Sequence, residues 1–183
     1  MLSQCIPAAT VAAHLGPETT QPGGGEQMAR FFFGTVGNRI DAKQRVSVPA
    51  GFRATLAELG SPDTIVAYRS SSIDGLECGP EQTTIALAEE LDSPDCSEDR
   101  QEAISLILAE TRELKLDREG RISLPEDLMQ QIGLTDEVMF IGQGKRFFMC
   151  SRTVSTAWTE AKLKRERAKT QARIDRLQDG AGR

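Results

Sequence analysis

The chain has 183 residues, of which 39% are hydrophobic and 27% are charged, and its formal net charge is −5 at pH 7. This length allows one ordinary domain or two small ones, and no apolar run approaches the roughly 20 residues of a membrane-spanning helix. The single histidine, His14, excludes most catalytic triads and histidine-bound metal sites. The four cysteines stand singly, which is typical of free thiols in a reducing cytosol. We therefore expect no enzymatic activity, cofactor, metal, small-molecule substrate or membrane association.

The first part of the chain has little hydrophobic pattern. Residues 1–29 are small and polar and include the run Pro22-Gly23-Gly24-Gly25. This composition predicts a disordered leader, or an addition that results from an early start codon.

A first folded unit is predicted over residues 30–80. An aromatic strand starts at 30–34, and the alternation at 45–48 is typical of a half-buried strand. Pro49 suits the first turn of a short helix, because the N–H that proline lacks is not needed there. We expect this helix to end at Gly60 and a further strand to follow. The apolar face of the helix consists of Phe52, Leu56 and Leu59, and the strand covers 65–68.

A helical connector is predicted over residues 81–110. Ser93 and Pro94 are typical of the N-cap and the first residue of a helix. The apolar stripe of this helix consists of Ile104, Ile107 and Leu108.

A second folded unit is predicted over residues 111–154, and a basic C-terminal helix and tail over 155–183. In the second unit a strand at 121–124 leads through Pro125 into a helix, which Gly133 is free to end in the left-handed conformation. Two more strands are expected to pair across the turn Gly142-Gln143-Gly144-Lys145, at 138–141 and 146–149. The C-terminal helix is expected to run from about 154 to 177.

The two units share a repeated motif. Asp41-Ala42-Lys43-Gln44-Arg45-Val46-Ser47-Val48-Pro49 returns 76 residues later as Asp117-Arg118-Glu119-Gly120-Arg121-Ile122-Ser123-Leu124-Pro125. Each unit of about forty residues is too small to bury its own sheet, so the two copies must pack together. We expect an α+β fold, mainly β, in which both copies build one closed or nearly closed β-barrel with helices at its rim.

The ordered motifs resemble the MraZ family of bacterial transcriptional regulators, which carry two SpoVT-AbrB-type units in tandem. The resemblance rests on Phe33-Gly34, the two copies of the repeat, Arg53, and the run Val138–Phe147, and it extends from about Arg30 to Arg152. It implies a pseudo-twofold swapped-hairpin barrel with flanking helices and a ring-shaped homo-oligomer. It also implies a cytoplasmic, nucleoid-associated protein that binds double-stranded DNA. The expected targets are short direct repeats upstream of its own division and cell-wall operon.

Candidate DNA contacts gather in and around the repeated turns. Arg45 and Arg121 each have a planar fork of donors, which can hold the neighbouring Asp on one side and present N–H groups to phosphate or guanine on the other. Lys43 is expected at the tip of the first turn, in reach of phosphate. Further candidates are Arg39, Arg53 and Arg118. For Asp41, Asp117 and Gly120 we expect a structural role in the turns, because a carboxylate that faced phosphate would be repelled.

One residue departs from the repeat. Gln44 stands where the second copy has Gly120, and a glycine there would permit a positive φ. Because glutamine adopts that conformation at a cost, we expect the first turn to avoid it.

Charge is segregated along the chain. Counting lysine and arginine against aspartate and glutamate, residues 30–53 carry +4, residues 74–113 carry −10 and residues 145–176 carry +7. A local field of this kind can steer phosphates to a surface even though the net charge is negative. The basic C-terminal helix is open to three interpretations: a solvated face, a non-specific DNA contact, or a contact with a neighbouring protomer.

Two alternatives stay open at this point. One is another SpoVT-AbrB-type regulator such as an antitoxin, although such proteins usually resemble a single unit. The other is an oligomeric scaffold whose acidic middle and basic tail bind protein and not DNA. The aromatic residues are expected in the core or at a protomer interface and not as base-stacking platforms; they are Phe31, Phe32, Phe33, Phe147 and Phe148.

Overall fold

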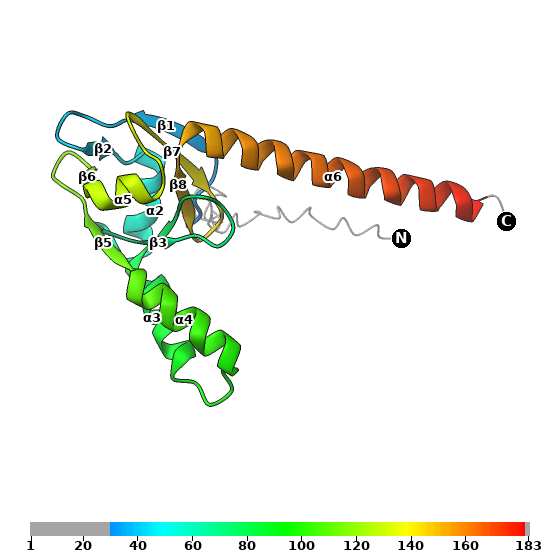
Figure 1. Cartoon of the computed structure of the whole chain (residues 1–183), viewed down its shortest axis with the longest axis horizontal. Coiled ribbons are helices and arrows are strands. Elements are labelled where there is room, and N and C mark those ends of the chain that lie inside the picture. Colours follow the sequence, from blue (N-terminus) through cyan, green and yellow to red (C-terminus); the bar gives the residue numbers. More distant parts are fainter. Residues whose placement is uncertain (1–29, 182–183) are drawn as a thin grey trace, which may run out of the picture.

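A computed structural model describes residues 30–181 of the chain, so the predicted leader lies outside the described residues. Figure 1 shows a β-rich body with two helical projections, a hairpin of two helices and one long helix. The strands are β1 (Thr35–Arg39), β2 (Arg45–Ser47), β3 (Thr64–Arg69), β4 (Leu76–Gly79), β5 (Arg112–Lys115), β6 (Arg121–Ser123), β7 (Glu137–Gly142) and β8 (Phe147–Cys150). The helices are α2 (Ala50–Glu58), α3 (Glu81–Leu91), α4 (Glu98–Glu110), α5 (Glu126–Gln131) and α6 (Arg152–Ala181). The fold is therefore α+β.

The strands form two antiparallel sheets. Six strands pair in the order β1-β7-β8-β4-β3-β5, and β2 pairs with β6 alone. Isolated bridges, Ile40 with Val46 and Leu116 with Ile122, join the small sheet to both edges of the large one. The predicted closed barrel is thus not present as one continuous sheet. At each corner, backbone groups form hydrogen bonds within the charged turn itself, as Asp41 N–H does with Arg45 O. Only a single bridge is left to join the two sheets there.

Strands of the first copy pair with strands of the second. β1 of the first copy pairs with β7 of the second, and β5 of the second copy pairs with β3 of the first. The registers correspond as well: Arg39 lies opposite Glu137, and Lys115 lies opposite Thr64. The pairs β2·β6 and β4·β8 each join equivalent strands. Neither copy could therefore form its sheet without the other.

One hydrophobic core serves both copies. Phe32 and Phe52 of the first copy contact Phe147 of the second, with ring centroids 4.9 and 5.1 Å apart, and Phe140 lies against the same cluster. On the other face of β7 and β8, Phe148 packs against Trp158 and fixes the base of α6 to the body. The predicted core positions are confirmed for Phe32, Phe147 and Phe148, whereas Phe31 and Phe33 are exposed.

The short helices follow the prediction, but the connector does not. α2 and α5 begin after Pro49 and Pro125 and are followed by glycines with positive φ, Gly60 and Gly133. The connector holds two helices and not one. Ser97 is the N-cap of α4, so the prediction that Ser93 and Pro94 begin a helix is wrong; both lie in the turn that separates α3 from α4. The acidic residues of the first turn of α4, Glu98 and Asp99, favour a start at this point.

Candidate nucleic-acid interface

The first charged turn is organised by one carboxylate. Oδ1 of Asp41 accepts hydrogen bonds from the backbone N–H groups of Lys43 (2.8 Å) and Arg45 (2.9 Å). Oδ2 accepts from Nε (2.9 Å) and Nη2 (2.7 Å) of the Arg45 side chain. The Arg45 side chain and then its backbone N–H lower the pKa of the Asp41 carboxyl to about 2, so Asp41 is ionised at neutral pH. The Arg45 side chain stays 29% exposed in this arrangement.

The second turn repeats this geometry. Oδ1 of Asp117 accepts from the backbone N–H groups of Glu119 and Arg121, both at 2.9 Å, and Oδ2 accepts from Arg121 Nε at 2.9 Å. The hydrogen bond from the Arg121 backbone N–H is the largest cause of the lowered pKa of the Asp117 carboxyl. The two turns therefore present arginines in equivalent ways.

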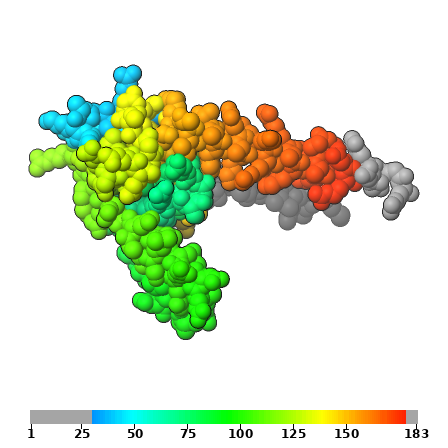
Figure 2. Space-filling model, viewed as in Figure 1, coloured from blue at the N-terminus to red at the C-terminus, as the bar shows by residue number. Residues whose placement is uncertain are grey.

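The strands that follow the turns form a two-stranded ribbon. Val46 lies opposite Ile122, and both are buried beneath it. Because strand side chains alternate, Arg45 and its partner Ser123 share the outward face with Ser47 and its partner Arg121. We call residues 41–47 and 117–123 the two-turn face. Figures 1 and 2 show both turns at the end of the body that faces away from the tip of α6.

Two serines of this face were not among the predicted site residues. Ser47 and Ser123 are exposed and lie opposite the arginines across the ribbon. Serine hydroxyls commonly bind phosphate oxygens. The sequence does contain a pattern that identifies these serines, because Arg-x-Ser occurs at the same place in both copies of the repeat.

The two turns differ in charge. Nη1 of Arg121 forms a second ion pair, with Oε2 of Glu119 at 2.6 Å. The equivalent position in the first copy is Lys43, which is exposed. Arg121 thus forms ion pairs with two carboxylates, whereas the ion pair of Arg45 is with Asp41. The first turn is therefore the more attractive surface for phosphate.

Three further predicted residues lie in or beside this face. Arg53 of α2 reaches the second turn: its Nε donates to Val48 O at 3.2 Å, and a Cβ added to Gly120 would lie 2.6 Å from Arg53 Cδ. The φ of 72° at Gly120 favours glycine, whereas the Arg53 side chain beside it is flexible and could move aside for a Cβ. Arg39 at the end of β1 and Arg118 in the second turn are exposed.

The expectation that Gln44 avoids a positive φ is wrong. Its φ is 59°, close to the 72° of Gly120. The conformation is held by hydrogen bonds on both sides, because Gln44 N–H donates to Asp41 O at 2.9 Å and Gln44 O accepts from Leu124 N–H at 2.8 Å. The second of these links the first turn to the strand of the other copy. The symmetry of the ribbon thus outweighs the conformational preference of glutamine.

We expect Gln44→Gly to stabilise the protein by about 1 kcal/mol, because glycine removes the left-handed penalty, which exceeds its extra freedom in the unfolded chain. Urea unfolding followed by circular dichroism measures the change. Ala42→Gly is the matched control in the same turn, where glycine brings only backbone entropy and should destabilise slightly. A lower unfolding midpoint for Gln44→Gly would contradict the proposed strain.

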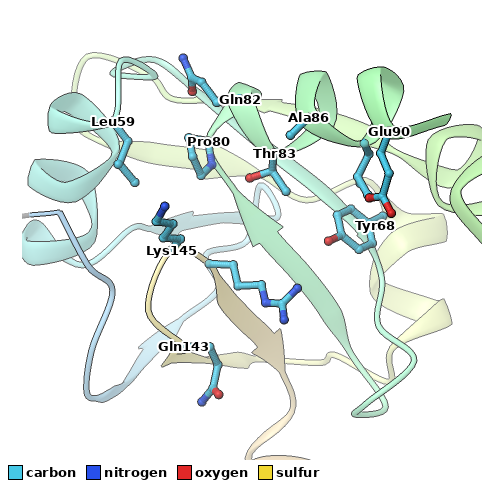
Figure 3. Close-up of a pocket in the computed structure, with 11 residues that line it drawn as sticks. Leu59, Tyr68, Pro80, Gln82, Thr83, Ala86, Glu90, Gln143 and Lys145 are labelled. Carbon is cyan, nitrogen blue, oxygen red and sulfur yellow. The ribbon is translucent and has the colours of Figure 1, made fainter. Parts of the chain in front are cut away.

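A separate pocket lies where α3 meets the body (Figure 3), with a volume of about 640 Å³. Leu59, Pro80 and Ala86 line one side, and Lys145 lies across from them. Beside it, the buried Glu77 carboxylate accepts hydrogen bonds from Tyr68 Oη (2.8 Å) and Arg146 Nη1 (2.6 Å). Burial, and then the bond to Glu77, raises the pKa of the Tyr68 hydroxyl. These polar groups satisfy one another and link β3 and β4 to the residue that precedes β8.

The described residues offer no cluster of three or more His, Cys, Asp or Glu side chains that could hold a metal ion. Cys78, Cys96 and Cys150 are free thiols, while Cys5 and His14 lie outside residues 30–181. Within the same range, no helix is both long and apolar enough to span a membrane.

Known proteins resemble this chain along most of its length. Residues 107–177 match the family model described as "MraZ protein, putative antitoxin-like". The transcriptional regulator MraZ of Gluconacetobacter diazotrophicus is 36% identical over 149 residues, which are 80% of this chain and 89% of that protein. The proteins of the same name from Gluconobacter oxydans and Parvibaculum lavamentivorans are 43% and 42% identical, over 64% and 63% of this chain and 73% of each relative. The chain therefore belongs to the MraZ family of transcriptional regulators.

Proposed function

We propose that this protein regulates transcription by binding double-stranded DNA through the two-turn face, at tandem direct repeats upstream of its own division and cell-wall operon. The observation that carries the proposal is the exposed ribbon on which Arg45 and Arg121 are each oriented by an ionised aspartate. The relatives bear the name of a transcriptional regulator and not of an enzyme.

The shape of this face suits duplex DNA. A two-stranded β-ribbon fits the major groove, where an arginine fork can bind the O6 and N7 atoms of guanine. Lys43, Arg118 and the serine hydroxyls would contact phosphates on either side and fix the register. Arg39 and Arg53, at the border of the face, would add phosphate contacts.

One copy of this face is too weakly charged to bind alone. Residues 41–47 and 117–123 hold four basic residues and three acidic ones, so a single face supplies few phosphate contacts. Several faces on one homo-oligomer would bind tandem repeats with the gain in effective concentration that multivalency provides. We infer a ring of protomers, each folded as a pseudo-twofold swapped-hairpin barrel, in the nucleoid of the cytoplasm. Repeats spaced near one helical turn would present the same groove to successive protomers.

Binding to upstream DNA tests the proposal. A fluorescent duplex that covers the region before the coding sequence is titrated with protein at moderate salt, with unlabelled competitor DNA, and anisotropy is recorded. Tight binding that is lost when the repeats are scrambled supports the proposal. Equal binding to scrambled DNA, or none, contradicts it and favours a scaffold that binds protein through the acidic helical hairpin.

We expect Glu119→Lys to raise the affinity for the repeats by about 1 kcal/mol per bound subunit, because it releases Arg121 from its second carboxylate and adds a phosphate contact. Anisotropy titration at two salt concentrations measures the change, which should be larger at low salt. Glu58→Lys, at an exposed position of α2, is the control for the added charge. An unchanged affinity would indicate that the second turn faces away from DNA.

A further inference from the structure

We propose that the acidic helical hairpin of one protomer packs along α6 of a second protomer, and that this contact joins copies head to tail. The inference rests on the self-association proposed above and names the surfaces that would carry it. We call residues 81–110 the arm. Figure 1 shows that the arm and α6 leave the body in different directions, so the contact must come from another copy.

The arm is strongly negative. It holds nine carboxylates and one basic residue, Arg100. That arginine is already neutralised, because Nε and Nη2 donate to the two carboxylate oxygens of Glu90 at 2.7 and 2.8 Å. α3 has no buried residue, and α4 buries only Ile104. The outer face of the arm is thus open to a partner.

Exposed apolar residues lie between the arm's carboxylates. Ile85 is 54% exposed and has Glu81 and Glu89 four residues before and after it. Leu106 is 61% exposed and is likewise placed between Glu102 and Glu110. Residues four apart are neighbours on a helix surface. Each helix of the arm therefore presents an apolar side chain bordered by negative charge.

α6 presents the complementary pattern. Leu163, Ile174 and Leu177 are exposed, and their spacings of 11 and 3 place them on one face of the helix. Arg167 lies four residues after Leu163, and Arg173 lies four residues before Leu177. Between residues 160 and 177 the helix holds seven basic and three acidic residues. It is 30 residues long, so at ~1.5 Å per residue it extends about 45 Å, of which only the base is packed on the body.

These two surfaces match in charge and in apolar pattern. The opposite charges would guide and orient the contact, and the apolar side chains would supply area removed from water. Because the arm and α6 are different surfaces, the contact is heterologous and repeats from copy to copy, which closes into a ring when the rotation allows. This contact would account for a strongly negative arm in a protein whose two-turn face is proposed to bind DNA.

Charge reversal on each surface tests the proposal. One variant carries Glu102→Arg and Glu110→Arg, a second carries Arg167→Glu and Arg173→Glu, and a third carries all four changes. Light scattering coupled to size exclusion gives the mass, and circular dichroism checks folding. We expect each single-surface variant to lose self-association by tenfold or more. An equimolar mixture of the two, and the fourfold variant, should regain it, since every contact in them again joins opposite charges.

A control and a second readout separate the outcomes. Glu58→Arg with Glu126→Arg reverses two exposed charges outside both surfaces and should keep the wild-type mass. Single-surface variants that keep the wild-type mass, or a mixture that fails to reassemble while folded, would overturn the inference alone. A wild-type protein that is monomeric at micromolar concentration would overturn both the inference and the proposed ring. Loss of DNA binding by the α6 variant at unchanged mass would assign α6 to DNA and overturn this contact.

Discussion

Arg45→Ala should remove specific binding to the upstream repeats while leaving the fold and the assembly intact. Loss of one base or phosphate contact costs roughly 1–3 kcal/mol, and every subunit bound to the DNA loses the same contact. With two bound subunits the affinity should fall about 30-fold or more. Fluorescence anisotropy with the repeat duplex measures this loss, and light scattering confirms that the mass is unchanged.

The matched control for this prediction is Arg121→Ala. It removes the equivalent side chain from the second copy, where Glu119 already neutralises part of the charge. We therefore expect a smaller loss of affinity than for Arg45→Ala, with the same small effect on stability, because both ion pairs are partly exposed. Equal losses would mean that both turns contact DNA alike. Wild-type affinity for Arg45→Ala would remove the two-turn face from the proposed mechanism.

The repeat in the sequence made much of this face predictable. Two copies of one motif, each too small to bury its own sheet, implied that equivalent turns and strands come from both halves of one body. The pairing of β2 with β6 fulfils that expectation. The motif also pointed to Asp41 and Arg45 as neighbours, because a short turn leaves them little room to separate.

The conformation of Gln44 shows where residue preference misled. Glutamine in a left-handed conformation is uncommon, so the residue alone argued against it. The equivalent position in the second copy is Gly120, which favours a positive φ, and the backbone of Gln44 adopts the same left-handed conformation. The backbone conformation of Gln44 is held by the hydrogen bond that its O accepts from Leu124 N–H across the ribbon. The conformational preference of a single residue cannot reveal such a long-range hydrogen bond.

The helical character of the arm was predicted, but its division into α3 and α4 was not. α3 has no buried residue, so its apolar side chains do not mark a core-facing stripe that would set its bounds in the sequence. The ion pair between Arg121 and Glu119 was hidden for a different reason. The sequence shows both residues, but only the folded turn decides that the guanidinium lies between Asp117 and Glu119.

The pairing of strands between the two copies also determines how the protein should unfold. The two copies contribute side chains to a single aromatic cluster, and strands of one copy complete the sheet of the other. An independent core in each copy would give two transitions. With one shared core, loss of either copy exposes the apolar surface of both, so the body should unfold in one cooperative step.

Phe147→Ala should lower the free energy of unfolding by about 3–5 kcal/mol, because it leaves a cavity in that shared core. Phe147 is fully buried, and its ring lies near those of Phe32, Phe52 and Phe140. Such a loss is a large part of the ~5–15 kcal/mol that stabilises a typical domain. Urea unfolding monitored by circular dichroism measures the change. Phe33→Ala, which removes a ring that is 59% exposed, is the matched control and should change stability by less than about 0.5 kcal/mol. The transition of Phe147→Ala should remain single, because the cavity weakens both copies together. Two separate transitions would contradict a shared core.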